Sequence, residues 1–275
     1  MMTKTILITG CSGGLGKALA VEAKRQGYRV FATARKEADL QHLQQLGLET
    51  IALEMTNPDS VKQAVLQLQQ QAGRLDILVN NAGFGVMGPV LDAGAEGLRQ
   101  QFEVNVFAAV DLTRACLPLL LQSKGLVVNI GSVSGVLTTP FAGVYCASKA
   151  ALHSLSDALR MELAPLGVRV LTVQPGAIDT GFASRASKEA ALLLKPDSLW
   201  WSMREGVMRR ANASQNRPSS AADFATALVS ELNKADCSGV LGIGHGAFTL
   251  PLLARWMPQR WLDKLLRHKF LVKIN

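Results

Sequence analysis

Short apolar runs rich in β-branched residues alternate with longer amphipathic segments over residues 1–180. The runs predict strands, because Val, Ile and Thr suit a pleated surface, and the longer segments predict helices with one apolar face. The predicted strands are residues 5–9, 29–34, 50–54, 77–80, 126–131 and 169–174, with 239–244 near the C-terminal end. The predicted helices are residues 15–26, 60–71, 96–122, 145–164 and 221–235.

Short connections join these elements, and strands that alternate with helices form a parallel sheet covered on both faces. Residues 126–130 are almost continuously apolar, as expected of a strand buried on both sides. The pattern predicts one doubly wound α/β domain over residues 1–248. Within it we expect residues 182–218 to form an insertion, and a basic amphipathic tail, residues 249–275, follows. Neither segment shows a core of its own.

Composition excludes several other classes of protein. The 275 residues are 48% hydrophobic and 18% charged, which suits a substantial core and not a disordered or collagen-like chain. The four cysteines lack C-x-x-C spacing, so we expect free thiols in a reducing compartment, without disulfides or a metal site. Because apolar residues 6–8 follow so soon after Met1, we expect no signal peptide, and no uncharged apolar run of about 18 residues is present. We therefore expect a cytoplasmic protein without a spanning helix.

The formal net charge of +8 is concentrated in two late segments. Residues 251–275 hold six Lys and Arg against Asp263, and residues 201–217 hold four Arg against Glu205. The remainder of the chain is therefore neutral. Since a duplex-binding protein more often carries a basic stripe on its folded body, this distribution disfavours nucleic acid as a partner.

A glycine-rich turn, residues 9–16, joins the first strand to the first helix with the spacing G-x-x-x-G-x-G. Gly10 allows the sharp turn, Gly14 lets a pyrophosphate approach the backbone, and Gly16 lets the helix and strand pack closely. The helix N-terminus then offers free N–H groups and the positive end of its dipole. The turn predicts a dinucleotide site, although a glycine-rich turn without a ligand is the alternative.

The end of the second strand distinguishes the two dinucleotides. An NAD site carries a carboxylate there for the ribose 2′-hydroxyl. Residues 30–36 contain no acid, and Arg35 and Lys36 stand where a guanidinium can bind a 2′-phosphate. A solvated charged turn is the alternative, but the missing acid and the present base together favour NADP, written NADPH in the reducing direction.

Tyr145 and Lys149 lie four residues apart in a predicted helix, so their side chains share one face. A cation beside a tyrosine lowers its pKa from about 10 toward neutral, which suits acid–base catalysis. Ser132 follows a buried strand, where ligands of open α/β sheets bind, and Asn105 is an unfavoured residue inside a predicted helix. Each has an ordinary structural explanation alone; together they predict a catalytic group.

With these motifs in this order, residues 5–182 resemble the classical short-chain dehydrogenase/reductase family, whose members have a Rossmann fold. N-N-A-G is present at residues 80–83 and P-G at Pro175 and Gly176. The family's catalytic tetrad falls on Asn105, Ser132, Tyr145 and Lys149. The cofactor contacts that the resemblance implies are Gly10, Ser12, Gly13, Gly14, Leu15, Gly16, Arg35, Glu54, Asn81, Ala82, Gly83, Tyr145, Lys149, Pro175, Gly176, Ile178 and Thr180.

Two positions depart from the family pattern. Glu54 stands where an Asp usually bonds the adenine amino group, and Gly13 stands where some NADP-dependent members have a basic residue. Arg35 therefore carries most of the argument for a 2′-phosphate.

The resemblance also implies how the residues share the reaction. Hydride passes from NADPH to a carbonyl carbon while Tyr145 gives its proton to the oxygen, which Ser132 holds. Lys149 bonds the nicotinamide ribose and lowers the pKa of Tyr145. Asn105 fixes a water that links Lys149 to solvent.

Residues 182–218 occupy the place where the family keeps its substrate lid. Their large apolar residues suit either a cavity wall or helix packing: Leu192, Leu193, Leu194, Trp200, Trp201, Met203 and Met208. The long basic-apolar end resembles retinol, hydroxysteroid and acyl-dihydroxyacetone-phosphate reductase-like members. We therefore expect reduction of a lipophilic aldehyde or ketone. The alternatives are a non-catalytic NADP-sensing regulatory module and a membrane-surface scaffold that uses the tail.

Apolar residues recur at helical spacing in the tail, residues 249–275, with basic residues among them, and Pro251 and Pro258 divide it into two short helices. This pattern is typical of a segment at a membrane interface. A lid or dimer contact over the substrate pocket explains it equally well. Peripheral contact with the inner membrane surface and a homo-oligomer are therefore both open.

Overall fold

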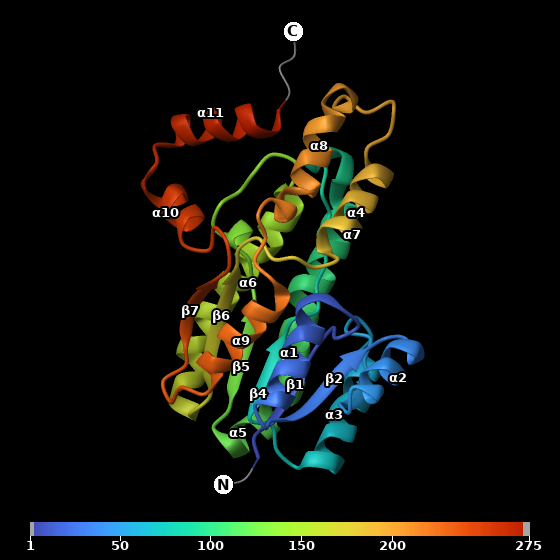
Figure 1. Cartoon of the computed structure of the whole chain (residues 1–275), viewed down its shortest axis with the longest axis vertical. Coiled ribbons are helices and arrows are strands. Elements are labelled where there is room, and N and C mark those ends of the chain that lie inside the picture. Colours follow the sequence, from blue (N-terminus) through green and yellow to red (C-terminus); the bar gives the residue numbers. More distant parts are fainter. Residues whose placement is uncertain (1–2, 272–275) are drawn as a thin grey trace.

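The computed structural model describes residues 3–271, which contain one seven-stranded sheet (Figure 1). The strands are β1 Thr5–Ile8, β2 Arg29–Ala34, β3 Glu49–Ala52, β4 Ile77–Asn80, β5 Leu126–Ile130, β6 Arg169–Pro175 and β7 Gly239–Ile243. All neighbours pair in parallel, in the order β3-β2-β1-β4-β5-β6-β7. The predicted α/β fold is confirmed, and each predicted strand is present.

Helices cover both faces of this sheet. The helices of the described residues are α1 Gly14–Arg25, α2 Glu37–Gln45, α3 Pro58–Ala72, α4 Val90–Phe102, α5 Ala108–Ser123, α6 Gly143–Leu163, α7 Phe182–Leu193, α8 Arg204–Ala211, α9 Ala221–Leu232, α10 Thr249–Trp256 and α11 Gln259–Phe270. Residues of α1, α2 and α9 pack on one face, and residues of α3, α5 and α6 pack on the other. In β1, Ile6 and Ile8 point into the first layer and Leu7 into the second, as the strand period requires.

Two helical segments differ from the sequence prediction. α2 was not predicted, because its buried stripe consists of Leu40 and Leu43 alone and is too short to show a period. The single helix predicted over 96–122 begins earlier and is divided into α4, a π-helical turn Glu103–Phe107, and α5. Gly94, with φ of 59°, adds a kink inside α4.

By length and composition alone, the run Val90–Ser123 could cross a membrane, which corrects the expectation that no helix passes such a test. The sequence analysis required an apolar run without any charged residue, whereas the test that this run passes allows up to two charged residues in a window of 18. Half of the apolar window is buried inside the protein, where Leu112 and Leu119 of α5 pack in the same layer as Leu7. Burial against the sheet accounts for its apolar character.

The carboxyl ends of the strands form the edge of the sheet that carries the predicted site. The chain runs from β1 outward through β2 and β3, then crosses back to β4 beside β1, so the strand order reverses there. Ligands of open α/β sheets bind in the crevice at such a reversal. In Figure 1, α4, α7, α8, α10 and α11 stand beyond this edge.

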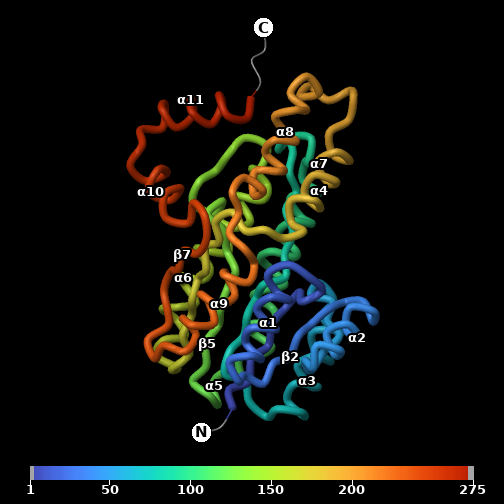
Figure 2. The backbone as a smooth tube through the Cα atoms, in the orientation of Figure 1, coloured from blue at the N-terminus to red at the C-terminus, as the bar shows by residue number. Residues whose placement is uncertain are grey.

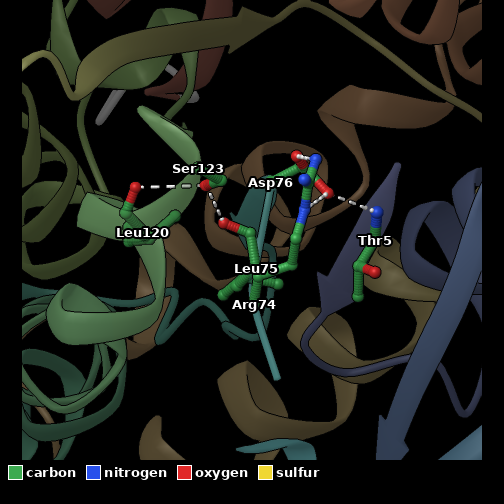
Figure 3. Close-up of polar contacts among 6 residues, drawn as sticks. All are labelled: Thr5, Arg74, Leu75, Asp76, Leu120 and Ser123. Carbon is green, nitrogen blue, oxygen red and sulfur yellow. Dashed lines mark hydrogen bonds and ion pairs between the residues drawn. The ribbon is translucent and has the colours of Figure 1, made fainter. Parts of the chain in front are cut away.

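The opposite edge is held by buried polar contacts around Asp76 (Figure 3). The Asp76 carboxylate accepts a hydrogen bond from the backbone N–H of Thr5 at 2.8 Å and pairs with Arg74. The Ser123 hydroxyl donates to the carbonyls of Leu75 and Leu120. These contacts join the beginnings of β1 and β4 to the end of α5, so the paired charge here serves the fold.

The segments after β6 gather around two small apolar clusters, which the sequence did not reveal. The first, the lid cluster, joins α7 and α8 to the start of α6 and consists of Met87, Phe141, Ala142, Tyr145, Cys146, Ala186, Ala190, Leu194, Val207 and Ala211. The second places Leu266 and Phe270 of α11 against Leu137. Figure 2 shows the tail folded back beside α8. The two predicted tail helices are present; residues 272–275 of the tail, with Lys273, lie outside the described residues.

Candidate active site

The glycine-rich turn has the geometry that its spacing predicts. Gly10 and Gly14 have φ of 70° and 54°, in the left-handed region that glycine tolerates. A Cβ at Gly16 would lie 2.4 Å from the Gly10 carbonyl oxygen, so only glycine lets α1 approach the turn this closely. α1 begins without a capping side chain or an acid in its first turn. Its first N–H groups therefore remain available to an anion.

The N-N-A-G segment is hydrogen-bonded to the start of this turn. The backbone N–H groups of Asn81 and Ala82 each donate to the Thr9 hydroxyl at 2.9 Å, and the Asn81 side-chain amide donates to the Thr9 carbonyl at 2.7 Å. A Cβ at Gly10 would lie 3.0 Å from Ala82 Cα. The contacts of Asn81 and Ala82 thus hold the backbone of the turn, and their predicted contact with a cofactor stays a prediction.

Arg35 follows β2 and lies beside Glu54, which follows β3. The Arg35 Nη1 and Glu54 Oε2 atoms are 3.4 Å apart, and the Arg35 side chain is 71% exposed. An exposed pair of this kind contributes about 0–1 kcal/mol. A phosphate can therefore take over the guanidinium at little cost, and the two residues predicted to bind the adenosine end do lie together.

The segment after β6 returns to the same edge of the sheet. Gly176 has no space for a side chain, since a Cβ there would lie 2.0 Å from the His245 carbonyl oxygen. Ile178 is buried next to Ser219. Thr180 stands opposite the turn, because a Cβ at Gly14 would lie 3.4 Å from Thr180 Cβ. The turn and the Pro175–Thr180 segment therefore lie next to each other at the carboxyl edge of the sheet.

Asn105 lies in the π-helical turn, a feature that often marks functional sites. Its amide oxygen accepts from the Phe84 N–H at 3.1 Å, and its amide nitrogen donates to the Phe84 carbonyl at 3.0 Å and the Ser148 hydroxyl at 3.1 Å. A Cβ at Gly83 would lie 3.1 Å from Asn105 Oδ1 and 3.7 Å from Lys149 Nζ. Asn105 thus ties the 83–84 segment to α6 next to Lys149.

Ser132 follows β5 and caps the start of a short 3₁₀ turn, Val133–Gly135. Its hydroxyl accepts from the Ser134 N–H at 3.0 Å, and its own N–H donates to His153 Nε2 at 3.3 Å. Tyr145, Lys149 and His153 recur every four residues on one face of α6. Burial and the charge of Lys149 lower the pKa of His153 to about 4. The imidazole is therefore neutral at pH 7 and can accept this bond.

Tyr145 and Lys149 are both buried, and their proton affinities differ from the sequence expectation. Burial raises the pKa of Tyr145, while hydrogen bonding to Ser132 and the charge of Arg210 oppose that rise. Burial lowers the pKa of Lys149 to about 8, and its ammonium donates to the Ile130 carbonyl at 2.7 Å. The expected lowering of the Tyr145 pKa by Lys149 is thus corrected: desolvation dominates, and the cation that acts on the phenol is Arg210.

The start of α7 packs directly on Tyr145. The ring of Phe182, the first residue of α7, packs on the Tyr145 ring with centroids 5.4 Å apart. Trp200, Met203 and Met208 pack around the lid cluster, whereas Leu192 is exposed. The apolar wall predicted for residues 182–218 is therefore built from part of that list, and it is continuous with the packing of α7 and α8.

Sequence reasoning missed two residues of this site. His153 was detectable as the next member of the Tyr145–Lys149 series on α6. Arg210 was not, because one of two successive arginines in a basic segment carries no sign that it is buried. The four cysteines are free and buried, and burial raises the pKa of Cys11 and Cys116 to about 12. Residues 3–271 hold no cluster of ligands suited to a metal ion.

Comparisons with known proteins agree with this geometry. Residues 4–191 match the family model for short chain dehydrogenase. Short-chain dehydrogenase cctT of Talaromyces islandicus is 44% identical over 182 residues, which cover 65% of this chain and 64% of that protein. The NADPH-dependent 1-acyldihydroxyacetone phosphate reductase of Schizosaccharomyces pombe is 35% identical over 214 residues, 76% of this chain and 72% of that one.

A solved structure extends the similarity beyond the matched region. A short-chain dehydrogenase from Streptomyces avermitilis superposes with a TM-score of 0.81 at 31% identity, covering 97% of this chain and 99% of that one. The similarity in fold therefore includes the segments after β6, where the lid and tail are found.

Proposed function

Because the chain belongs to the short-chain dehydrogenase family of oxidoreductases, which bind a nicotinamide cofactor, we propose that it reduces a lipophilic aldehyde or ketone with NADPH. The observation that carries the proposal is that Tyr145 and Lys149 lie buried one helical turn apart on α6, and that buried Ser132 follows β5 at the same edge of the sheet. Together they offer a proton donor and an oxygen-binding hydroxyl at the carboxyl edge of the sheet.

The residues at this edge of the sheet suit the phosphates of a dinucleotide. The open N-terminus of α1 would hold the pyrophosphate, Arg35 would hold a 2′-phosphate, and Thr180 would close the opposite side. NADPH supplies the hydride when bound. The NADPH dependence in the name of the Schizosaccharomyces pombe relative supports the choice of NADP.

The residues around the reacting carbonyl hold and supply the proton. A raised pKa keeps the Tyr145 phenol protonated at pH 7, so it acts as the general acid that reduction of a carbonyl requires. Ser132 donates its hydroxyl hydrogen to the carbonyl oxygen, and the hydrogen bond that its backbone N–H donates to His153 Nε2 orients the Ser132 backbone. The apolar residues of the lid cluster exclude water and suit a lipophilic substrate.

Oxidation of NADPH with a panel of medium-chain aldehydes and ketones tests this function. We expect absorbance loss at the NADPH band with at least one carbonyl and less than 1% of that rate with Tyr145→Phe, an estimate of about 100-fold from general-acid catalysis. Tight NADPH binding without turnover would instead support the non-catalytic NADP-sensing module. A protein that shows neither NADPH binding nor turnover would support the membrane-surface scaffold.

We further propose that this enzyme is cytoplasmic and contacts a membrane surface through the tail. One face of α11 is occupied by its contact with Leu137, but Trp256 and Trp261 are 75% and 73% exposed. Arg255 and Arg260 lie next to them in the chain and are also exposed. Exposed indole rings next to cations suit an anionic lipid interface.

Sedimentation with anionic liposomes tests the contact. We expect the protein to pellet with vesicles at low salt and to be released as salt screens the basic residues, while Trp256→Ser/Trp261→Ser stays in the supernatant. If the protein stays in the supernatant at every salt concentration, the membrane contact is refuted and the tail serves as a lid or a dimer contact.

We also propose self-association. Leu155 and Met161 of α6 are 40% and 62% exposed, which favours a second copy on this helix. Light scattering after size-exclusion chromatography measures the oligomeric state, and a monomer at micromolar concentration contradicts the proposal.

A further inference from the structure

Arg210 is a buried cation whose charge opposes the rise in the Tyr145 pKa, but which neither transfers a proton nor holds the carbonyl in the proposed reaction. Among residues 3–271, the charged side chains of the core are Asp76, Lys149 and Arg210, each less than 9% exposed. Asp76 pairs with Arg74, and Lys149 belongs to the catalytic group. Arg210, near the end of α8, has neither explanation.

The partners of Arg210 are all neutral. Its Nε donates to the Thr139 hydroxyl, and its Nη2 donates to the Ser134 hydroxyl at 3.4 Å. The guanidinium also lies 6.0 Å from the ring centroid of Phe270. No carboxylate of the described chain lies within 4.0 Å, and burial lowers the pKa of Arg210. These two bonds use two of the five N–H donors of the guanidinium, and both acceptors are uncharged hydroxyls.

A lone buried charge is costly. Removing an ion from water costs several kcal/mol, which a neutral hydroxyl repays only in part. Packing alone does not explain the residue, since an apolar side chain of similar length would fill the space without that cost. An anion that arrives with a ligand would provide the missing charge.

The position of Arg210 indicates which ligand. Ser134 accepts from the guanidinium and donates its N–H to the Ser132 hydroxyl, so one residue separates Arg210 from the group that holds the carbonyl oxygen. The apolar residues of the lid cluster surround the same place, with Met208 on the same helix. Cation, carbonyl site and apolar wall thus lie together.

We propose that Arg210 binds an anionic group, a carboxylate or a phosphate monoester, that the substrate carries close to its reacting carbonyl. The substrates are then anionic amphiphiles, whose head lies at Arg210 and whose chain lies along the lid cluster. This inference rests on the proposed function in calling the ligand a substrate. Binding of an anion at Arg210 does not itself require turnover. A planar guanidinium with several N–H donors suits the two oxygens of either anion.

Two matched pairs of carbonyl compounds test the site by turnover. One pair is 3-oxododecanoate and its methyl ester; the other is 1-hydroxydodecan-2-one with and without a phosphate on its hydroxyl. We expect the anionic member of at least one pair to have a KM about tenfold or more below its neutral partner, as a charge-assisted bond implies. Arg210→Met should remove that difference between the anionic and the neutral member. Which pair responds distinguishes carboxylate from phosphate.

A binding measurement separates the site from the reaction. Tryptophan fluorescence of the NADP⁺-saturated full-length protein is titrated with dodecanoate, dodecyl phosphate and dodecanol. We expect at least one anion to bind about tenfold tighter than the alcohol, and this preference to be lost in Arg210→Met. Arg210→Gln, which keeps a polar hydrogen-bonding side chain without the charge, serves if the Met variant does not fold. Arg204→Met, an exposed arginine of the same helix, is the matched control.

The outcomes are distinct. Anion preference that survives in both Arg210 variants, or that Arg204→Met removes equally, overturns the proposal, as does wild-type protein without any preference. Anion binding that depends on Arg210 in a protein that oxidises NADPH with none of the carbonyls retains the site and rejects the proposed function.

Discussion

Buried charge is compensated by an opposite charge at the amino edge of the sheet, but not at the carboxyl edge. At the amino edge, Asp76 is paired with Arg74 and accepts from Thr5, so its charge is compensated within the fold. At the carboxyl edge, Lys149 and Arg210 are buried against a carbonyl and hydroxyls. Such an arrangement is unfavourable by itself and becomes favourable when a ligand brings negative charge or electron-rich oxygen.

This difference separates stability from function. Compensated charges add to the free energy of unfolding and leave the chemistry alone, whereas uncompensated cations reduce stability in return for binding and reactivity. We therefore expect substitutions at the two edges to change different measured quantities.

The largest expected effect is on turnover. Tyr145→Phe keeps the ring on Phe182 but removes the transferable proton. We expect kcat to fall by about 100-fold or more, the range of general-acid catalysis, with NADPH affinity and the melting temperature little changed. Steady-state kinetics and NADPH titration measure both. Near-normal kcat on the best substrate would show that the carboxyl edge does not work through this phenol.

The next effect is on acid stability. Because the pKa of His153 is lowered from 6.5 to about 4, the unfolded chain takes up this proton first as pH falls. The contribution of neutral His153 to stability is complete above pH 6.5 and lost as pH falls through 4. Between pH 6.5 and 4, we expect the free energy of unfolding of the wild type to fall by on the order of 3 kcal/mol more than that of His153→Gln.

Urea unfolding at several pH values measures this difference. His42→Gln changes an exposed histidine of α2 and is the matched control, expected to behave as wild type. Equal acid sensitivity of wild type and His153→Gln would contradict the role of the buried imidazole.

A smaller effect concerns the cofactor. Arg35→Ala should weaken NADPH by on the order of 2–3 kcal/mol, the value of a charge-assisted hydrogen bond, and leave NADH nearly unchanged. The weak pair with Glu54 adds little to the cost. Fluorescence titration with both cofactors gives the ratio, and equal weakening of the two would refute the 2′-phosphate assignment.

The smallest effect tests the amino edge. Asp76→Asn retains an acceptor for Thr5 but loses the charge opposite Arg74, so we expect a loss of about 1–2 kcal/mol in the free energy of unfolding. The kcat and KM at a temperature where the variant is folded should match wild type. A change in kcat comparable to that of a site variant would break the distinction between the edges.

Much of this fold could be predicted because its signals are local. Strands such as Leu126–Ile130 are apolar on both faces, and the spacing of Gly10, Gly14 and Gly16 reports a turn whose close approaches admit only glycine. α2 and the π-helical turn at Asn105 could not be predicted in this way. The first has too short an apolar stripe, and the second arises from hydrogen bonds to Phe84 and Ser148 that are distant in sequence.

The site divides along the same line. Tyr145 and Lys149 could be paired from their spacing, and His153 continues that series on α6. Their pKa values could not be predicted, because burial by α7 and by the lid cluster sets them. Arg210 lay beyond sequence reasoning for the same reason: its burial depends on α11, which folds back from the end of the chain.

The contact between α11 and α8 orders events during synthesis. A Cβ at Gly206 would meet the backbone of Phe270, so the last helix lies directly on the lid, and its Phe270 ring faces Arg210. Because chains are made from the N-terminus, the glycine-rich turn and the tetrad leave the ribosome well before Phe270 does. A chain made only as far as α9 therefore lacks the helix that covers Arg210. Strands β1–β6 and the glycine-rich turn leave the ribosome before α11 can pack on α8.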